Sequence, residues 1–185
     1  LHLSDRRQRQ MCIRDSIVVS TVMSNYGFKQ AIEKFNFDLI ETPVGDKYVA
    51  EAMKKYDAAL GGEQSGHIII SDLLPVGDGL VTLIYVLKAM QHFGVALSDF
   101  KKENLYEYPQ KLTNLELENK LNDEELEYIN QIALDMSIKK DLDGRYLIRN
   151  SGTEPLLRVL VEAKSNEAME DFSNELITKI NKYLN

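Results

Sequence analysis

Residues 17–70 read IVVSTVMSNYGFKQAIEKFNFDLIETPVGDKYVAEAMKKYDAALGGEQSGHIII. In this stretch, short β-branched and apolar runs alternate with longer segments whose apolar residues recur at helical spacing. Strands that alternate with helices indicate an α/β domain. We predict strands at 17–21, 37–40, 58–60 and 67–70, and helices at 26–35 and 47–55.

A further helix is predicted after Gly77-Asp78. We expect this helix to end near Gly94, and Ser98, shortly after it, is a candidate N-cap. The apolar residues of this helix recur at a spacing that predicts one buried face: Leu80, Leu83, Ile84, Leu87 and Met90.

A second domain is predicted to begin near Leu105, where apolar residues become sparse among Lys, Asn and Glu. Asn122 and Glu125 have the spacing of a capping box, which predicts a helix that runs to about Ser137. The other elements expected in this domain are an edge strand at 112–117, a hairpin-type turn at Asp143-Gly144, strands at 145–148 and 156–163, and a last helix that Ser165-Asn166 caps.

We therefore expect a truncated α/β sheet domain over residues 17–104, followed by a small α+β C-terminal domain over residues 105–185. Residues 1–16 are predicted to be a non-native or disordered leader. They begin with Leu1 and show neither helical nor strand periodicity. A native basic tail is the alternative interpretation.

Composition is that of an ordinary soluble globular protein, with 44% hydrophobic and 28% charged residues and a net charge of -7. The acidic balance argues against nucleic acid as a partner. No apolar run reaches the length of about 20 residues that a membrane helix needs, so no membrane partner is expected. The single cysteine, Cys12, excludes an internal disulfide, and a cytoplasmic location is the default expectation.

The loop at residues 149–155 is a candidate phosphate-binding site. Arg149 offers a planar fork for two phosphate oxygens, and Arg158 offers a second cation. Ser151 and Thr153 add hydroxyl donors, while Gly152 lets backbone N–H groups approach a ligand closely. The alternative is a polar hairpin loop with solvated arginines.

The glycine-rich loop at residues 61–67 is a candidate sugar-binding site. Its three glycines predict a tight turn that brings Glu63, Ser65 and His67 together at the ends of two strands. The Glu63 carboxylate could accept hydrogen bonds from two neighbouring sugar hydroxyls, with Ser65 bonding beside it. His67 could orient a phosphate or transfer a proton. The alternative is a structural turn with an exposed glutamate.

A third loop places Thr42, Gly45, Asp46 and Lys47 before a predicted helix. Helix N-termini favour anions, so these residues are candidates for substrate binding. The alternative is that Asp46 caps the helix and that Lys47 is solvated.

Taken together, the three loops resemble the α-D-phosphohexomutase family. Gly-Glu-Gln-Ser-Gly-His at 62–67 resembles the family's sugar-binding loop, and Arg-Asn-Ser-Gly-Thr-Glu-Pro at 149–155 resembles its phosphate-binding loop. Thr-Pro-Val-Gly-Asp-Lys-Tyr-Val at 42–49 resembles a further active-site loop. The resemblance runs from about Ile17 to the C-terminus. Asn150 departs from it, because a proline would be expected there.

The resemblance implies an intramolecular phosphotransferase with a phosphorylated hexosamine as substrate. Gln64 and the segment 22–25 favour members that interconvert glucosamine 6-phosphate and glucosamine 1-phosphate on the way to peptidoglycan precursors. Members that act on mannose and glucose phosphates usually have Met in place of Gln64, and they remain the alternative. A non-catalytic phosphosugar-binding module is a second alternative.

The resemblance also implies that the reacting groups lie outside this chain. Family members use a phosphoserine and a Mg²⁺ ion held by an Asp-rich loop, and neither motif occurs in the sequence. We therefore expect no catalytic nucleophile and no metal ligands in this chain, and no turnover by the chain alone. The sequence does not indicate an oligomeric state.

Overall fold

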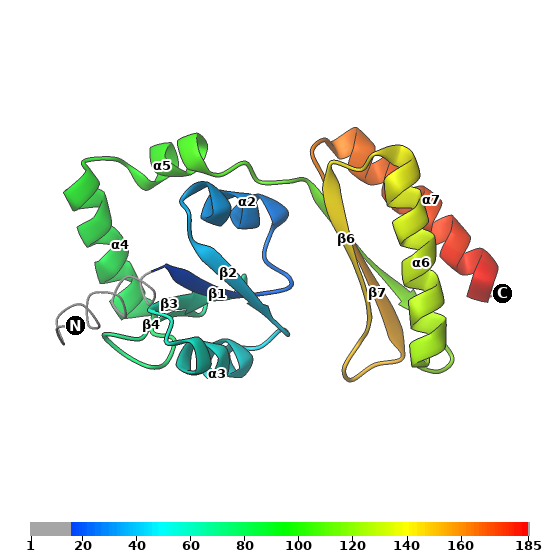
Figure 1. Ribbon diagram of the computed structural model, residues 1–185, viewed down its shortest axis with the longest axis horizontal. Coiled ribbons are helices and arrows are strands. Elements are labelled where there is room, and N and C mark those ends of the chain that lie inside the picture. The colour runs from blue at the N-terminus through cyan, green and yellow to red at the C-terminus, as the bar shows by residue number, and fades with distance from the viewer. Residues whose placement is uncertain (1–15, 185) are drawn as a thin grey trace, which may run out of the picture. The chain divides into compact units, whose positions relative to one another are not determined.

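The structure, a computed structural model, describes residues 16–184. The chain forms two compact units, residues 1–106 and residues 107–185 (Figure 1). We call them the first and the second unit. The predicted leader at 1–16 lies outside the described residues except for Ser16, so its assignment stays a prediction.

The first unit contains a four-stranded sheet in the order β2-β1-β3-β4. Strand β1 pairs in parallel with both β2 and β3, while β4 pairs antiparallel to β3. The elements are β1 (Ile17–Thr21), α2 (Tyr26–Lys34), β2 (Asp38–Thr42), α3 (Asp46–Tyr56), β3 (Leu60–Gly62), β4 (Ile68–Ile70), α4 (Gly79–Phe93) and α5 (Leu97–Asn104). The predicted α/β class is confirmed.

Helices α2 and α3 lie on opposite faces of this sheet (Figure 1). The chain crosses from β1 to β2 through α2 and returns past β1 to β3 through α3. Right-handed crossovers, the usual hand between parallel strands, place their helices on opposite faces when they run in opposite directions along a sheet. Val49 and Met53, four residues apart on α3, pack with Val19 of β1 in the core. Gly61 of β3 makes room for them, since a Cβ there would lie 2.4 Å from Met53 Sδ.

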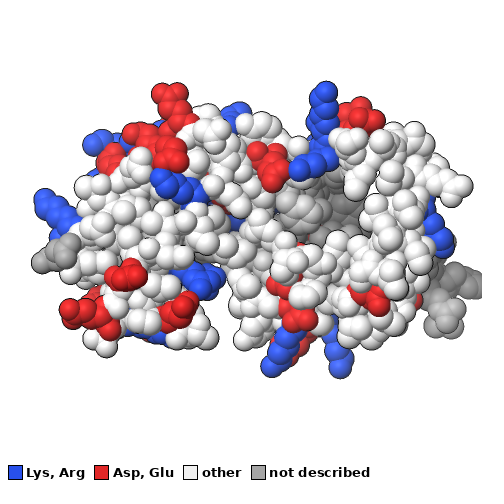
Figure 2. All heavy atoms as spheres, turned by 180° about the vertical axis from the view of Figure 1, so that it is seen from behind, with Lys and Arg blue, Asp and Glu red and all other residues white. Residues whose placement is uncertain are grey.

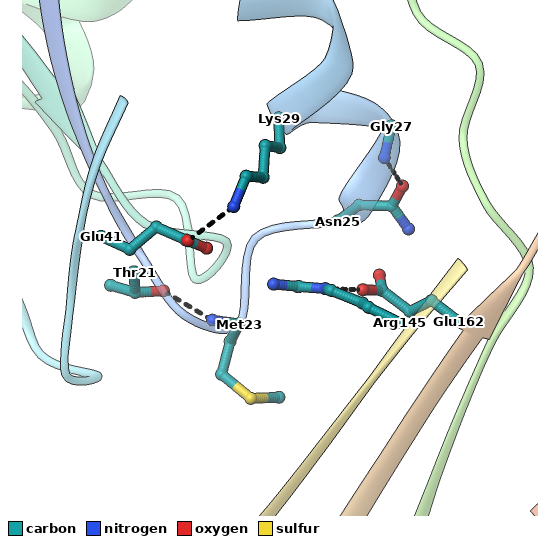
Figure 3. A network of polar contacts seen from close by, with 8 residues as sticks. All are labelled: Thr21, Met23, Asn25, Gly27, Lys29, Glu41, Arg145 and Glu162. Carbon is teal, nitrogen blue, oxygen red and sulfur yellow. Dashed lines mark hydrogen bonds and ion pairs between the residues drawn. The ribbon is translucent and has the colours of Figure 1, made fainter. Parts of the chain in front are cut away.

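Two predicted helix caps of the first unit are wrong. The N-cap of α3 is Gly45, and Asp46 is the first helical residue, whose Oδ1 accepts a hydrogen bond from Lys47 N–H at 2.8 Å. The N-cap of α5 is Ala96, and Ser98 lies inside the helix. The N-cap of α2 is Asn25, whose side chain accepts a 3.0 Å bond from Gly27 N–H (Figure 3).

Helix α4 forms where predicted, with Asp78 as its N-cap and Gly94 as its C-cap, but its predicted burial is wrong. None of its residues is buried, and Leu80, Leu83, Ile84 and Leu87 are each more than half exposed. Its main contacts are with β4, which is only three residues long. A strand of about 10 Å cannot cover a helix of about 22 Å.

The second unit is a three-stranded antiparallel sheet in the order β5-β7-β6, with two helices packed against one face. Its elements are β5 (Gln110–Glu116), α6 (Asp123–Lys140), β6 (Gly144–Asn150), β7 (Leu156–Ala163) and α7 (Asn166–Leu184). Strand β5 is an edge strand, as predicted. The largest buried side chains of the core are Ile129 of α6, Leu157 of β7, and Phe172, Leu176 and Ile180 of α7.

The start of α6 is the predicted capping box. Asn122 Oδ1 accepts from Glu125 N–H at 2.9 Å, and Glu125 Oε2 accepts from Asn122 N–H at 2.8 Å. Asp143-Gly144 is not a hairpin turn, because it joins α6 to β6; the hairpin of this unit is the loop 151–155 between β6 and β7. Gly144 is already a strand residue and pairs with Ala163.

Basic and acidic side chains are interspersed on the face of the molecule that Figure 2 shows. Among the described residues, basic and acidic side chains also form ion pairs, such as Lys29 with Glu41 at 3.1 Å (Figure 3) and Lys140 with Glu175 at 2.8 Å. In the part of the chain that the structure describes, no single helix has the length and apolar composition to cross a membrane. The bent pair α4 and α5 meets the criterion together by length and composition.

Candidate functional site

The carboxyl ends of β1, β2 and β3 meet at one edge of the first sheet, because these strands run parallel. Two hydroxyls tie the three ends together. Ser20 Oγ of β1 donates to Gly62 O of β3 at 3.0 Å, and Thr42 Oγ1 of β2 lies 3.3 Å from Ser20 O. Ser20 and Thr42 are both buried. The glycine-rich loop and the loop before α3 therefore start from a fixed base.

The glycine-rich loop is a closed turn between β3 and β4. Glu63 N–H donates to His67 O at 3.0 Å, and Gly66 N–H donates to Glu63 O at 3.0 Å. Gly66 has a φ of +101°, which side chains other than glycine rarely adopt. These backbone bonds place residues 63 and 67 side by side at the strand ends.

The predicted grouping of Glu63, Ser65 and His67 is present in the structure. His67 Nδ1 lies 2.7 Å from Glu63 Oε1 and 3.4 Å from Ser65 Oγ. The Glu63 side chain is only 9% exposed, whereas the His67 side chain is 57% exposed. The structure thus places a nearly buried carboxylate beside an accessible imidazole.

The two titratable groups shift each other's pKa in opposite directions. Hydrogen bonds from Ser65 and then His67 lower the pKa of Glu63 below its ordinary 4.5, against the opposing effect of burial. The hydrogen bond to Glu63 raises the pKa of His67 above its ordinary 6.5, and the charge of Asp46 adds to this. Glu63 is therefore ionised at neutral pH and can accept hydrogen bonds from ligand hydroxyls.

The four residues predicted in the loop before α3 fall into two groups. Gly45 and Asp46 lie near the glycine-rich loop, because the backbone of Gly45 contributes to the lowered pKa of Glu63 and the charge of Asp46 contributes to the raised pKa of His67. Thr42 is buried and bonds to the backbone, and Lys47 is 76% exposed with its Nζ 3.9 Å from a Glu51 oxygen. The structure does not bring Thr42 and Lys47 to the Glu63 carboxylate.

In the second unit, the loop 151–155 is the turn of the β6–β7 hairpin. Ser151 N–H donates to Leu156 O at 2.8 Å, which closes the hairpin. Asn150 holds the loop from the side, because its amide bonds to both the N–H and the C=O of Leu121, at 3.3 and 2.8 Å. Lys120 Nζ donates to Gly152 O at 2.6 Å. No sequence pattern indicates Lys120 as part of this loop, because 32 positions separate it from Gly152.

Two arginines face each other across this hairpin. Arg149 of β6 and Arg158 of β7 are directly paired in the ladder, and Asn114 of β5 continues the row. Burial, and then the charge of Arg158, lower the pKa of Arg149. Arg158 reaches Glu154 at 3.5 Å, but among the described residues no carboxylate forms an ion pair with Arg149. Opposed like charges destabilise a sheet unless an anion lies between them.

The same corner has unused hydrogen-bonding groups. Ser151 is 2% exposed, and its Oγ lacks a hydrogen-bond partner within the described chain, as does the buried Nε of Arg158. Buried polar atoms are usually bonded, so unpaired ones need an explanation. A bound anion would supply an acceptor to Ser151 Oγ and to both arginines. Gly152 has open space around it, and Thr153 lies in the same turn.

The described residues do not fit a metal site. Over residues 16–184, no group of three or more His, Cys, Asp or Glu side chains could hold a metal ion. A Mg²⁺ ion prefers several oxygen ligands in octahedral geometry. We therefore assign no metal ligand to the described part of the chain.

Two surface hollows of the first unit lie away from the predicted residues. One lies beside α3 and β4, and the other beside α2 and the end of α5. Neither is lined by Glu63, Ser65 or His67, or by the predicted residues of the loop before α3. The candidate site of this unit is thus the open edge of the sheet.

Comparison with known protein families decides where the chain belongs. The family model for the alpha/beta/alpha domain III of phosphoglucomutase/phosphomannomutase matches residues 2–108, and the model for the C-terminal domain matches residues 112–179. The chain belongs to the phosphoglucomutase/phosphomannomutase family. The predicted domain ranges, 17–104 and 105–185, stay a prediction.

Among members of the phosphoglucomutase/phosphomannomutase family, the chain is similar to bacterial phosphoglucosamine mutases. It is 42% identical over 165 residues to that of Bacillus subtilis, which covers 89% of this chain and 37% of the relative. It is 44% identical over 171 residues to that of Streptococcus agalactiae, which covers 91% of this chain and 37% of the relative. The chain thus spans little more than a third of the length of these relatives.

Solved structures of the phosphohexomutase superfamily share the fold. The N-acetylphosphoglucosamine mutase of Aspergillus fumigatus matches 96% of this chain and 40% of its own, with a TM-score of 0.79 and 19% identity. The same fungal enzyme in complex with GlcNAc-6P and magnesium matches 92% of this chain and 42% of its own, with a TM-score of 0.75 and 20% identity. At these identities the likeness supports the fold only.

Proposed function

We propose that this chain forms the sugar- and phosphate-binding part of a phosphoglucosamine mutase, an isomerase that interconverts glucosamine 6-phosphate and glucosamine 1-phosphate. The relatives at 42% and 44% identity carry that name. The observation that carries the binding role is the corner of Arg149, Arg158 and Ser151: among the described residues no carboxylate pairs with Arg149, and Ser151 Oγ and Arg158 Nε are buried without a hydrogen-bond partner. Because the chain spans about a third of these relatives, the full reaction would need the rest of such an enzyme.

The glycine-rich loop would bind the sugar. The ionised Glu63 carboxylate accepts from hydroxyls, and Ser65 and His67 flank it. Asp46 adds a second negative charge near His67, which favours its protonated form at a phosphosugar. Gly45 and Asp46 belong to this site, whereas Thr42 supports the strand ends from inside.

The loop 151–155 would grip the phosphate that is not reacting. Arg149 and Arg158 neutralise its charge, and Ser151, Gly152 and Thr153 offer hydroxyl and backbone donors. Phosphoryl transfer depends mainly on such positioning and charge neutralisation. A Mg²⁺ ion, when bound by the rest of such an enzyme, would neutralise charge on the transferred phosphoryl group.

A chimeric enzyme tests the proposal. Residues 16–184 would replace the corresponding segment of the Bacillus subtilis phosphoglucosamine mutase, to which the chain is 42% identical. We expect the chimera to interconvert the two glucosamine phosphates, and the Arg149→Ala chimera to bind them more weakly. A folded chimera that is inactive, or indifferent to the loss of Arg149, would refute the proposal.

Two alternatives are tested with the same protein. Phosphomannomutase/phosphoglucomutase activity predicts that the chimera prefers mannose or glucose phosphates over glucosamine phosphates in parallel assays. A non-catalytic phosphosugar-binding module predicts ligand binding by the chain but no turnover by the chimera. We expect the 185-residue chain alone to show no turnover.

A further inference from the structure

The segment that connects β5 to α6, residues 117–121, is hydrogen-bonded to the β6–β7 hairpin on both sides of its turn. Before the turn, the side-chain amide of Asn150 bonds to the N–H and the C=O of Leu121, at 3.3 and 2.8 Å. After the turn, Leu117 N–H donates to Pro155 O at 2.9 Å. The connecting segment therefore holds the candidate phosphate loop in place.

This segment and the two arginines lie on opposite sides of the hairpin. Successive side chains of a strand point to opposite faces of the sheet. The side chain of Asn150 reaches Leu121, so the side chain of the preceding residue, Arg149, points to the other face. Directly paired residues of antiparallel strands share a face, which places Arg158 on the side of Arg149.

Lys120, in the connecting segment, bonds to a peptide group within the turn. Its Nζ donates to Gly152 O at 2.6 Å. The C=O of Gly152 and the N–H of Thr153 belong to one trans peptide group, in which they point in opposite directions. Thr153 N–H therefore points away from the Lys120 ammonium group. Among residues 16–184 this N–H has no hydrogen-bond acceptor, and Thr153 is exposed.

The orientation of this peptide group depends on the bond from Lys120. Glycine accepts a wide range of backbone angles, so the peptide group after Gly152 can turn over at little steric cost. A Cβ at Gly152 would meet no atom within 4 Å, which shows that close packing does not fix the peptide group either. The printed contact that does fix it is the hydrogen bond to Lys120.

We propose that Lys120 is a positioning residue of the phosphate site: by holding Gly152 C=O, it turns Thr153 N–H toward the arginine side of the hairpin, where this N–H donates to a bound phosphate. The proposal rests on the proposed function, in which the loop 151–155 grips a phosphate. It assigns to Lys120 a role through the backbone of the loop, in addition to its positive charge.

The first test uses the unmodified 185-residue chain and inorganic phosphate. In an NMR titration, phosphate should move the Thr153 amide proton resonance downfield, and a coupling across the hydrogen bond should join Lys120 Nζ to the Gly152 carbonyl carbon. A Thr153 resonance that stays constant while the Arg149 side chain responds to phosphate would overturn the proposal. So would a missing coupling between Lys120 and Gly152.

The second test compares three variants. Lys120→Met should abolish the Thr153 response at saturating phosphate and raise the dissociation constant for phosphate about tenfold, the scale of losing one hydrogen bond to an anion. Lys120→Arg keeps a donor for Gly152 O and should retain the response. Lys179→Met is the matched control, because it removes the same charge from an exposed ion pair with Glu175 on α7 and should leave both readouts unchanged.

The outcomes separate a positioning role from a role of charge alone. If Lys120→Met binds phosphate more weakly but keeps the Thr153 response at saturation, Lys120 acts only through its charge and the proposal is overturned. Weaker binding together with a lost response supports it. The hydrogen bonds of Asn150 and Leu117 remain in this variant, so we expect it to fold; if it does not, the coupling and the Thr153 response of the unmodified chain decide.

The same titration distinguishes failure of this inference from failure of the function on which it rests. If phosphate moves the Arg149 side-chain resonances equally in the unmodified chain and in Lys120→Met, with the same Thr153 response, the phosphate site stands and the role of Lys120 is refuted. If phosphate moves no resonance of residues 149–158 in the unmodified chain, the proposed phosphate site fails, and the positioning role fails with it.

Discussion

Replacing Arg149 by methionine should weaken ligand binding without destabilising the fold. Methionine keeps a long apolar side chain and removes the charge, so the change isolates electrostatics from packing. In the ligand-free chain Arg149 is paired with Arg158 across the β6–β7 ladder, and no carboxylate of the described residues forms an ion pair with Arg149. Arg149 thus raises the free energy of the empty site and lowers that of the occupied one.

Arg149→Met should stabilise the empty fold slightly and weaken phosphate binding strongly. Removing a like charge directly opposite another in a sheet should raise the free energy of unfolding by up to about 0.5 kcal/mol. Losing a bidentate, charge-assisted contact to phosphate should cost about 2–3 kcal/mol of binding free energy, a factor of roughly 30–150 in the dissociation constant.

Arg145→Met is the matched control. Arg145 lies on the same strand and the same face, four residues away, but its Nε pairs with Glu162, which is fully buried (Figure 3). Breaking a buried ion pair leaves an uncompensated charge and should lower the free energy of unfolding by about 3 kcal/mol. The two substitutions therefore make the same chemical change in opposite electrostatic surroundings.

Urea unfolding of the chain, with and without inorganic phosphate, measures both effects. Phosphate should stabilise the unmodified chain and Arg145→Met by similar increments, and Arg149→Met by much less, because only ligand bound to the folded state adds stability. A large loss of stability in Arg149→Met without phosphate would show that this side chain is structural. Equal phosphate stabilisation of all three proteins would refute the anion site.

Three further predictions concern the two units separately. Asn122→Ala should lower the free energy of unfolding by about 1 kcal/mol in urea titrations, because it removes the capping box of α6. The pair of Glu63 and His67 should contribute its full stability between pH 4.5 and 6.5. This stability should be lost at lower pH as Glu63 protonates with its lowered pKa, and at higher pH as His67 deprotonates with its raised pKa. In an NMR titration, Glu63→Gln should shift the His67 pKa downward, and an unchanged value would contradict the pairing. Gly144→Ala should destabilise the chain by about 2–3 kcal/mol, since its Cβ would lie 2.0 Å from a backbone oxygen of β7, whereas Gly152→Ala, in open space, should be nearly neutral.

The sequence predicted the elements of both units well, because local signals set most of them. Strand β1 has the predicted ends, and the capping box at Asn122 starts α6 at the predicted residue. Strand β3 was misplaced by two residues, since Gly61 and Gly62 were interpreted as turn residues. They are strand residues, and Gly61 serves the close approach of α3 to the sheet. Only the packing of α3 against the sheet reveals that role.

The candidate site was predicted in part. The turn that groups Glu63, Ser65 and His67 is local, so its spacing was enough to predict it. The effect of Asp46 on His67 connects two loops that are about 20 residues apart in the sequence, and the spacing of residues within one loop carries no signal for it. The burial of α4 was predicted wrongly for a related reason, because helical spacing shows an apolar face but not what lies against it.

The turn between β3 and β4 has a consequence for what the chain can tolerate. Surface loops usually accept an extra residue, because their ends are held by neighbours and their interior by water. In this turn the backbone bonds to itself instead, because Glu63 N–H donates to His67 O and Gly66 N–H donates to Glu63 O. One residue inserted between Glu63 and His67 would part the carboxylate from the imidazole, even if every original side chain remained. The number of residues in this turn therefore matters as much as which residues they are.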